Sequence, residues 1–175
     1  MEDKIKSKYG DNTINILDLC SGTGVLGISL AKRVNYNNLV LSDISLEANK
    51  LAGLNASLHN ISLSINEGDL FENIDSRFDV IISNPPYIDN KENVEDIVYN
   101  NEPHLALFAY PCYSFYERII KDMGKYLNPH YLVGFEIDEG MEEILTKIIH
   151  SYLDNVKYEF FKDIYGLLRY LVLEK

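Results

Sequence analysis

Short apolar runs alternate with amphipathic stretches along most of the chain. The runs predict buried strands, and the stretches between them predict helices because apolar residues recur about every 3–4 positions. We expect strands at 14–19, 39–41, 61–65, 78–82, 131–137, 156–161 and 168–173, and helices at 25–34, 46–59, 115–127 and 141–153. In the second of these helices, Leu51, Leu54 and Leu58 share one face. This alternation predicts an α/β fold with a mostly parallel seven-stranded sheet and helices on both faces.

Composition places the chain among soluble globular proteins. Its 175 residues predict one domain spanning 1–175, with 46% hydrophobic residues and no apolar stretch near the length of a membrane span. The polar start, with Lys4, Lys6 and Lys8, does not resemble a secretory signal. Cys20 and Cys112 match no zinc spacing, so we predict no metal site and a reducing, cytoplasmic location.

The acidic balance bears on the choice of partner. A formal net charge of -11 repels polyanions at long range, which disfavours nucleic acid as a substrate. The segment from Ile88 to Glu102 is long and acidic and directly follows a predicted strand. Long loops at strand ends are more often functional than filler, with a disordered insertion as the alternative.

A glycine turn joins the first predicted strand to the first predicted helix. Gly22, Gly24 and Gly27 fit the spacing G-x-G-x-x-G, which lets a backbone approach a ligand closely. Asp43 ends the second strand, where a carboxylate can accept hydrogen bonds from ribose hydroxyls. These features serve both NAD and S-adenosylmethionine. Asp18, four residues before Gly22, favours the second cofactor, because its spacing resembles motif I of class I methyltransferases.

The tetrapeptide Asn84-Pro85-Pro86-Tyr87 follows the fourth predicted strand and indicates the chemistry. A planar NH2 nitrogen is a poor nucleophile and carries two N–H donors. The Asn84 side-chain oxygen and the Pro85 carbonyl can accept both hydrogens, and the two prolines hold that carbonyl rigidly. Tyr87 can pack against a flat substrate group. We therefore predict catalytic roles for Asn84, Pro85 and Tyr87, and substrate binding by all four residues.

Several segments together resemble the HemK/PrmC family of protein-glutamine methyltransferases. They are Ile16–Gly24, Gly68–Phe71, Ile82–Ile88, the Glu-Pro block Glu102–Leu107 and the ending Lys162–Arg169. The resemblance implies a Rossmann-like class I methyltransferase fold, S-adenosyl-L-methionine as cofactor, and the glutamine of the Gly-Gly-Gln loop of peptide chain release factors as substrate. It implies a cofactor site made by Asp18, Cys20, Ser21, Gly22, Thr23, Gly24, Asp43, Asp69, Leu70 and Asn84. Within that site, Asp69 is implied to meet the adenine amino group and Leu70 the ring.

The sequence departs from the family pattern in three places. The N-terminal helical domain typical of bacterial members does not precede the first strand, glycines are missing after the Glu-Pro block, and Glu136-Ile137-Asp138 replaces Glu-Ile-Gly. We interpret Glu102, Glu136 and Arg169 as structural by default. Three alternatives stay open: methylation of adenine N6 or cytosine N4 in DNA or RNA, an inactive cofactor-binding module, and, more distantly, an NAD-dependent dehydrogenase.

Overall fold

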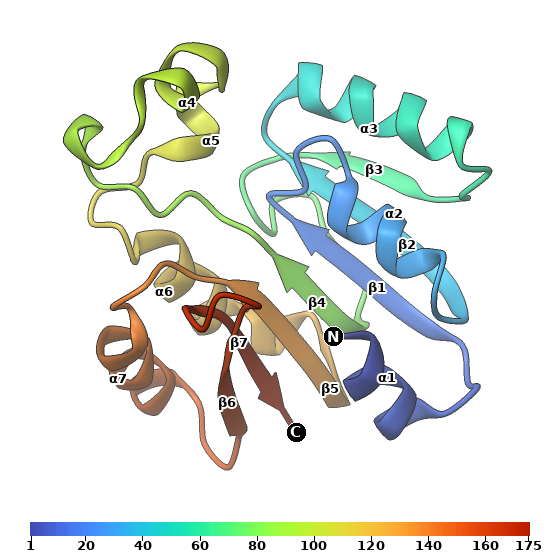
Figure 1. The fold of residues 1–175 in the computed structure, drawn as a ribbon. Coiled ribbons are helices and arrows are strands. Elements are labelled where there is room, and N and C mark those ends of the chain that lie inside the picture. The colour runs from blue at the N-terminus through green and yellow to red at the C-terminus, as the bar shows by residue number, and fades with distance from the viewer.

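A computed structural model describes residues 1–175, except for the side chain of Asn93. Its centre is one seven-stranded sheet in the order β3-β2-β1-β4-β5-β7-β6 (Figure 1). Strands β1 to β5 run parallel, and β7 is antiparallel to both β5 and β6. The seven strands are β1 Ile14–Leu19, β2 Tyr36–Asp43, β3 Ser64–Glu67, β4 Phe78–Ser83, β5 Leu127–Glu136, β6 Lys157–Lys162 and β7 Leu168–Glu174. The predicted α/β class and the mostly parallel seven-stranded sheet are confirmed.

Helices cover both faces of this sheet and enclose two apolar cores (Figure 1). One face carries α1 Glu2–Tyr9, α2 Val25–Ala31 and α3 Leu46–Leu58, and its core includes Ile16, Leu39, Val80 and Ala52. The other carries α6 Ser114–Asp122, which the short helix η2 Met123–Lys125 joins to β5, and α7 Glu142–Tyr152, which follows β5. None of the helices in the described part of the chain has the length and apolarity to cross a membrane.

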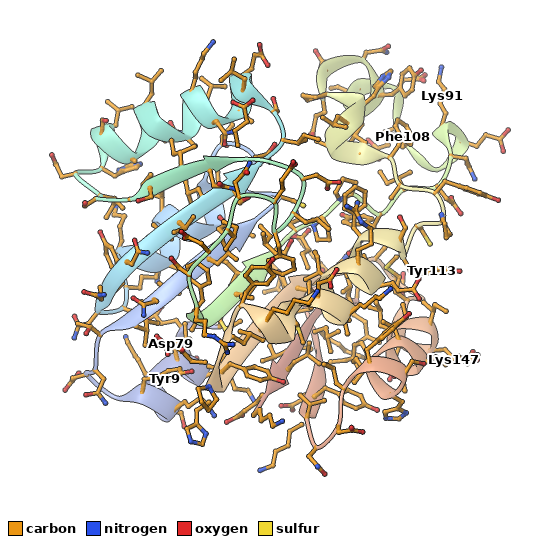
Figure 2. The ribbon with its side chains drawn as sticks, turned by 180° about the vertical axis from the view of Figure 1, so that it is seen from behind. Tyr9, Asp79, Lys91, Phe108, Tyr113 and Lys147 are labelled. Carbon is orange, nitrogen blue, oxygen red and sulfur yellow. The ribbon has the colours of Figure 1, made fainter. Side chains whose placement is uncertain are left out.

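Helix α1 was not among the predicted elements. Ile5 is buried beneath it, and the single Tyr9 hydroxyl hydrogen is shared between the carbonyls of Asp79, at 3.1 Å, and His130, at 3.0 Å. Figure 2 shows Tyr9 beside Asp79, at the amino end of β4. A single apolar anchor in a polar segment gives too weak a periodicity to be detected in the sequence.

The long acidic segment is folded. It contains η1 Lys91–Asn93, α4 Asp96–Asn101 and α5 His104–Leu107, so the alternative of a disordered insertion is wrong. Ile88 and Phe108 form a bridge that closes residues 88–108 into a lobe, and the Tyr99 ring lies 4.4 Å from that of His104. Figure 2 labels Lys91 and Phe108 on this lobe. The lobe stands beyond the carboxyl end of β4 (Figure 1).

Two other expectations need correction. The third strand is at Ser64–Glu67 rather than 61–65, and Leu127, placed in a helix by its periodicity, begins β5. On α3, Leu51, Leu54 and Leu58 share a face as predicted, but that face is exposed. The smaller Ala52 and Ala56 are buried instead, because α3 packs closely on the sheet.

Candidate active site

The glycine turn after β1 is held by two carboxylates. Asp18 is fully buried, and its Oδ2 accepts the Gly27 N–H at 2.8 Å. Asp43, at the end of β2, accepts the Gly22 N–H at 2.8 Å and the Ser45 N–H at 2.9 Å. Asp43 thereby joins the turn to the start of α3, and its side chain is only partly buried.

The turn also depends on glycine geometry. Gly22 and Gly24 have φ angles of 52° and 79°, a left-handed conformation that side chains disfavour. No atom lies within 4 Å of where a Gly22 Cβ would stand, so a ligand can reach the backbone there. Cys20 also has a positive φ of 54°, a conformation that glycine adopts more readily than a residue with a side chain.

Two buried polar atoms at this turn have no hydrogen-bond partner among the described residues. They are Asp18 Oδ1 and Ser21 Oγ. Burial raises the pKa of the Asp18 carboxyl to about 7, against the opposing hydrogen bond from Gly27, and the charge of Asp43 adds to the rise. Buried unpaired polar groups are costly and are usually satisfied by water or a ligand. These residues therefore fit a cofactor that brings polar hydrogens to the turn, as the amino-acid end of S-adenosylmethionine does.

The segment after β3 lies beside this turn. Ser42 Oγ donates to the Leu70 carbonyl at 3.0 Å, and the Gly68 N–H donates to the Asp43 carbonyl at 3.2 Å. Leu70 is buried in the core, with 7% of its surface exposed, so little of its side chain is free to contact an adenine ring. Asp69 Oδ2 accepts a 2.6 Å hydrogen bond from Arg118 of α6, which leaves Oδ1 for other donors.

The tetrapeptide begins directly after β4. Ser83 Oγ donates to the Leu19 carbonyl at 2.7 Å and ties the end of β4 to the end of β1. Asn84 is exposed, and its side-chain amide bonds to none of the residues that the structure describes. Pro85 and Pro86 are buried, and no described donor reaches the Pro85 carbonyl. Both acceptors that the sequence predicts are thus available, next to the glycine turn.

Tyr87 is half-buried beneath the lobe. Burial raises the pKa of its hydroxyl, and the charges of Glu136, Asp138 and Glu102 raise it further while Arg169 lowers it. These four charged residues therefore lie near enough to Tyr87 to act on its hydroxyl electrostatically. A neutral phenol can serve as a packing surface and hydrogen-bond donor.

Strand order brings the predicted cofactor and substrate residues together. β3, β2, β1 and β4 are adjacent and parallel, so their carboxyl ends place Asp69, Asp43, the glycine turn and Asn84 along one edge. Thr23 is exposed, and it touches α3 through its carbonyl, which accepts from Asn55 at 2.9 Å. This edge is where open α/β sheets bind ligands.

Sequence reasoning missed two residues at this edge. Ile44, directly after Asp43, is a large apolar residue that is 52% exposed at the carboxyl end of β2. An apolar residue following a strand-terminal acid is the signal that could have identified it. No local pattern could identify Arg118, whose partner Asp69 is 49 residues away.

Comparisons with known proteins indicate the family of this chain. Residues 4–105 match the methyltransferase small domain family. Over 168 residues, or 94% of this chain and 60% of the relative, the chain is 31% identical to the release factor glutamine methyltransferase of Streptococcus pneumoniae. The enzyme of the same name from Staphylococcus aureus is 36% identical over 162 residues, 89% of this chain and 58% of the relative. The chain therefore spans about three fifths of these relatives' length.

A solved structure shares the fold. The ribosomal protein L11 methylase from Lactobacillus delbrueckii subsp. bulgaricus superposes with a TM-score of 0.72 at 18% identity, covering 98% of this chain and 75% of that one.

Proposed function

Because the chain belongs to the methyltransferase small domain family, as a HemK/PrmC member, we propose that it methylates a planar amide nitrogen using S-adenosyl-L-methionine. We propose the glutamine of the Gly-Gly-Gln loop of peptide chain release factors as the acceptor. The relatives' name, release factor glutamine methyltransferase, and the two free acceptors Asn84 and Pro85 support this choice.

The observation that carries the proposal is the tie between Ser83 and Leu19. It holds the Asn84-Pro85 pair beside the glycine turn, at the ends of neighbouring strands. When bound, the cofactor would supply an electrophilic methyl group: the sulfur–methyl bond breaks to leave S-adenosylhomocysteine, the nitrogen–methyl bond forms, and the nitrogen loses one of its two protons. Asn84 Oδ1 and the Pro85 carbonyl accept the two amide hydrogens and orient the nitrogen toward that methyl group. Alignment within about 3–3.5 Å provides most of the acceleration, and the fixed dipoles of the two acceptors add to it.

The variant Asn84→Ala tests this role. We expect loss of methyl transfer to release factor, while the affinity for S-adenosylmethionine, measured by calorimetric titration, falls much less. Asn90→Ala is a matched control, since Asn90 is an exposed asparagine six positions further along the chain. Unchanged turnover in Asn84→Ala contradicts the assigned role. A parallel radiolabel transfer to DNA and RNA tests the nucleic-acid alternative, which the net charge of -11 disfavours.

A further inference from the structure

Glu136 is the last residue of β5 and stands at the same edge as the tetrapeptide. In the parallel pair of β4 and β5, Ser83 is in register with Phe135, the last pair of that ladder. Asn84 and Glu136 each follow this pair, and the two strands end together (Figure 1). Glu136, interpreted from the sequence as structural, therefore ends the strand next to the one that Asn84 follows.

The direction of the Glu136 side chain follows from strand alternation. Phe135 packs into the core beneath α6 and α7, so its neighbour Glu136 points to the opposite face. There it lines a cavity of about 330 Å³ that is bounded by the start of α1, by α2 and by β4, β5 and β7, together with Leu26 and Tyr170. Tyr170 is in register with Glu136 on β7 and is 45% exposed. Both side chains line this cavity, as does Ser83, the residue that precedes the tetrapeptide.

The Glu136 carboxylate has no hydrogen-bond or ion-pair partner among the described residues. Its backbone is fixed, because the Tyr116 hydroxyl donates to the Glu136 carbonyl at 2.8 Å. Arg169 is engaged elsewhere, in a 2.8 Å ion pair with Asp138. Burial raises the pKa of the Glu136 carboxyl, and the charge of Arg169 only partly offsets this. A partly buried carboxylate without a partner gains from any donor that a ligand brings.

We propose that Glu136 is a specificity residue that accepts an N–H donor group of the acceptor polypeptide, beside the amide to be methylated, with Tyr170 covering the flanking chain. This inference rests on the proposed function. The donor is either a backbone N–H or a cationic side chain near the glutamine. Either one fits a carboxylate at the rim of a cleft in a protein of net charge -11.

The position of Glu136 favours the acceptor over the cofactor as its partner. β4 lies between β5 and β1, so Glu136 is two strands away from the glycine turn. That turn has its own unpaired acceptor in Asp18 Oδ1. Asn84, by contrast, is on the adjacent strand end.

The experiment compares the variants Glu136→Ala and Glu136→Gln with the control Glu139→Gln. Glu139 is a nearby exposed glutamate, and its substitution removes the same charge. The probe is a labelled Gly-Gly-Gln peptide with a flanking arginine, and a second peptide has norleucine in its place. Peptide affinity is measured by fluorescence anisotropy with S-adenosylhomocysteine present, and the affinity for S-adenosylhomocysteine is measured separately by calorimetry.

We expect Glu136→Ala to weaken binding of the arginine peptide about 10-fold or more, as for a hydrogen bond to a charged group. Binding of S-adenosylhomocysteine and the Glu139→Gln control should stay within about twofold. If Glu136→Gln keeps the affinity, the donor is a backbone N–H. If it loses the affinity for the arginine peptide alone, the donor is the cation.

Unchanged peptide affinity in Glu136→Ala overturns the inference, as does an equal loss of S-adenosylhomocysteine affinity. Because these are binding measurements, they remain decisive for Glu136 even when the wild type transfers no methyl group. That absence of transfer would instead count against the proposed function. In an active enzyme, the same variant should raise KM for the peptide and leave kcat nearly unchanged.

Discussion

Raising the pH from about 5.5 to about 7.5 should destabilise the ligand-free protein through Asp18. Burial raises the pKa of this carboxyl from 3.8 to about 7, so the folded state binds the proton more tightly than the unfolded state. The resulting stabilisation is complete below the unfolded pKa and is lost as the pH rises through about 7. The stabilisation falls mainly between about pH 5.5 and the folded pKa of about 7. At about 1.4 kcal/mol per pH unit over these roughly 1.5 units, the free energy of unfolding decreases by about 2 kcal/mol.

Urea unfolding of the wild type and of Asp18→Asn, at several pH values across this range, isolates the effect of Asp18. All other titrating groups are shared, so the difference between the two free energies of unfolding should change by about 2 kcal/mol. S-adenosylmethionine should bind more tightly as Asp18 ionises, because its ammonium group prefers the carboxylate, and Asp18→Asn should weaken this pH dependence. If the free energies of unfolding of the two proteins change in parallel with pH, the pKa of Asp18 is not raised by burial at the turn.

The remaining predictions concern packing. Gly27→Ala places a Cβ 2.6 Å from Leu41 Cδ2, so we expect a loss of about 1–3 kcal/mol in urea unfolding. Gly124→Ala, whose Cβ would meet nothing within 4 Å, should change stability by less than about 0.5 kcal/mol, and equal effects would contradict the clash. Tyr9→Phe removes the one hydroxyl that both carbonyls can accept from, and should cost about 1–2 kcal/mol by the same measurement. Tyr110→Phe is the control, because Tyr110 is 88% exposed, and it should leave the free energy of unfolding unchanged. An equally unchanged Tyr9→Phe variant would contradict the role of Tyr9 in anchoring α1.

Much of the fold was predictable because its central strands are short segments rich in buried apolar residues. β1 matched its predicted bounds, and β4 extends one residue further. Helix α1 was not predictable, since its stability comes from contacts with distant segments, as the bond from Tyr9 to the Asp79 carbonyl illustrates. On α3, periodicity identified a leucine stripe but not its direction, which depends on how closely the small residues on the other side approach the sheet.

The candidate site was predictable where local sequence determines geometry. The glycine turn and the tetrapeptide each need particular backbone conformations within a few residues, so their residue types identify them. The pairing of Asp69 with Arg118 and the setting of Glu136 depend on strand order and register. A single sequence specifies those relationships only through the whole fold, so Glu136 could not be told from a structural acid.

The hydroxyl of Ser83, donating across to the Leu19 carbonyl, has a mechanical consequence. It links the end of β1, where the cofactor's methyl group would be held, to the end of β4, where the acceptor amide would be held. Reactants delivered to these two segments would meet at a spacing built into the sheet itself. Local unfolding of either strand end would therefore disturb the placement of the cofactor and of the acceptor amide together, before the rest of the molecule unfolds.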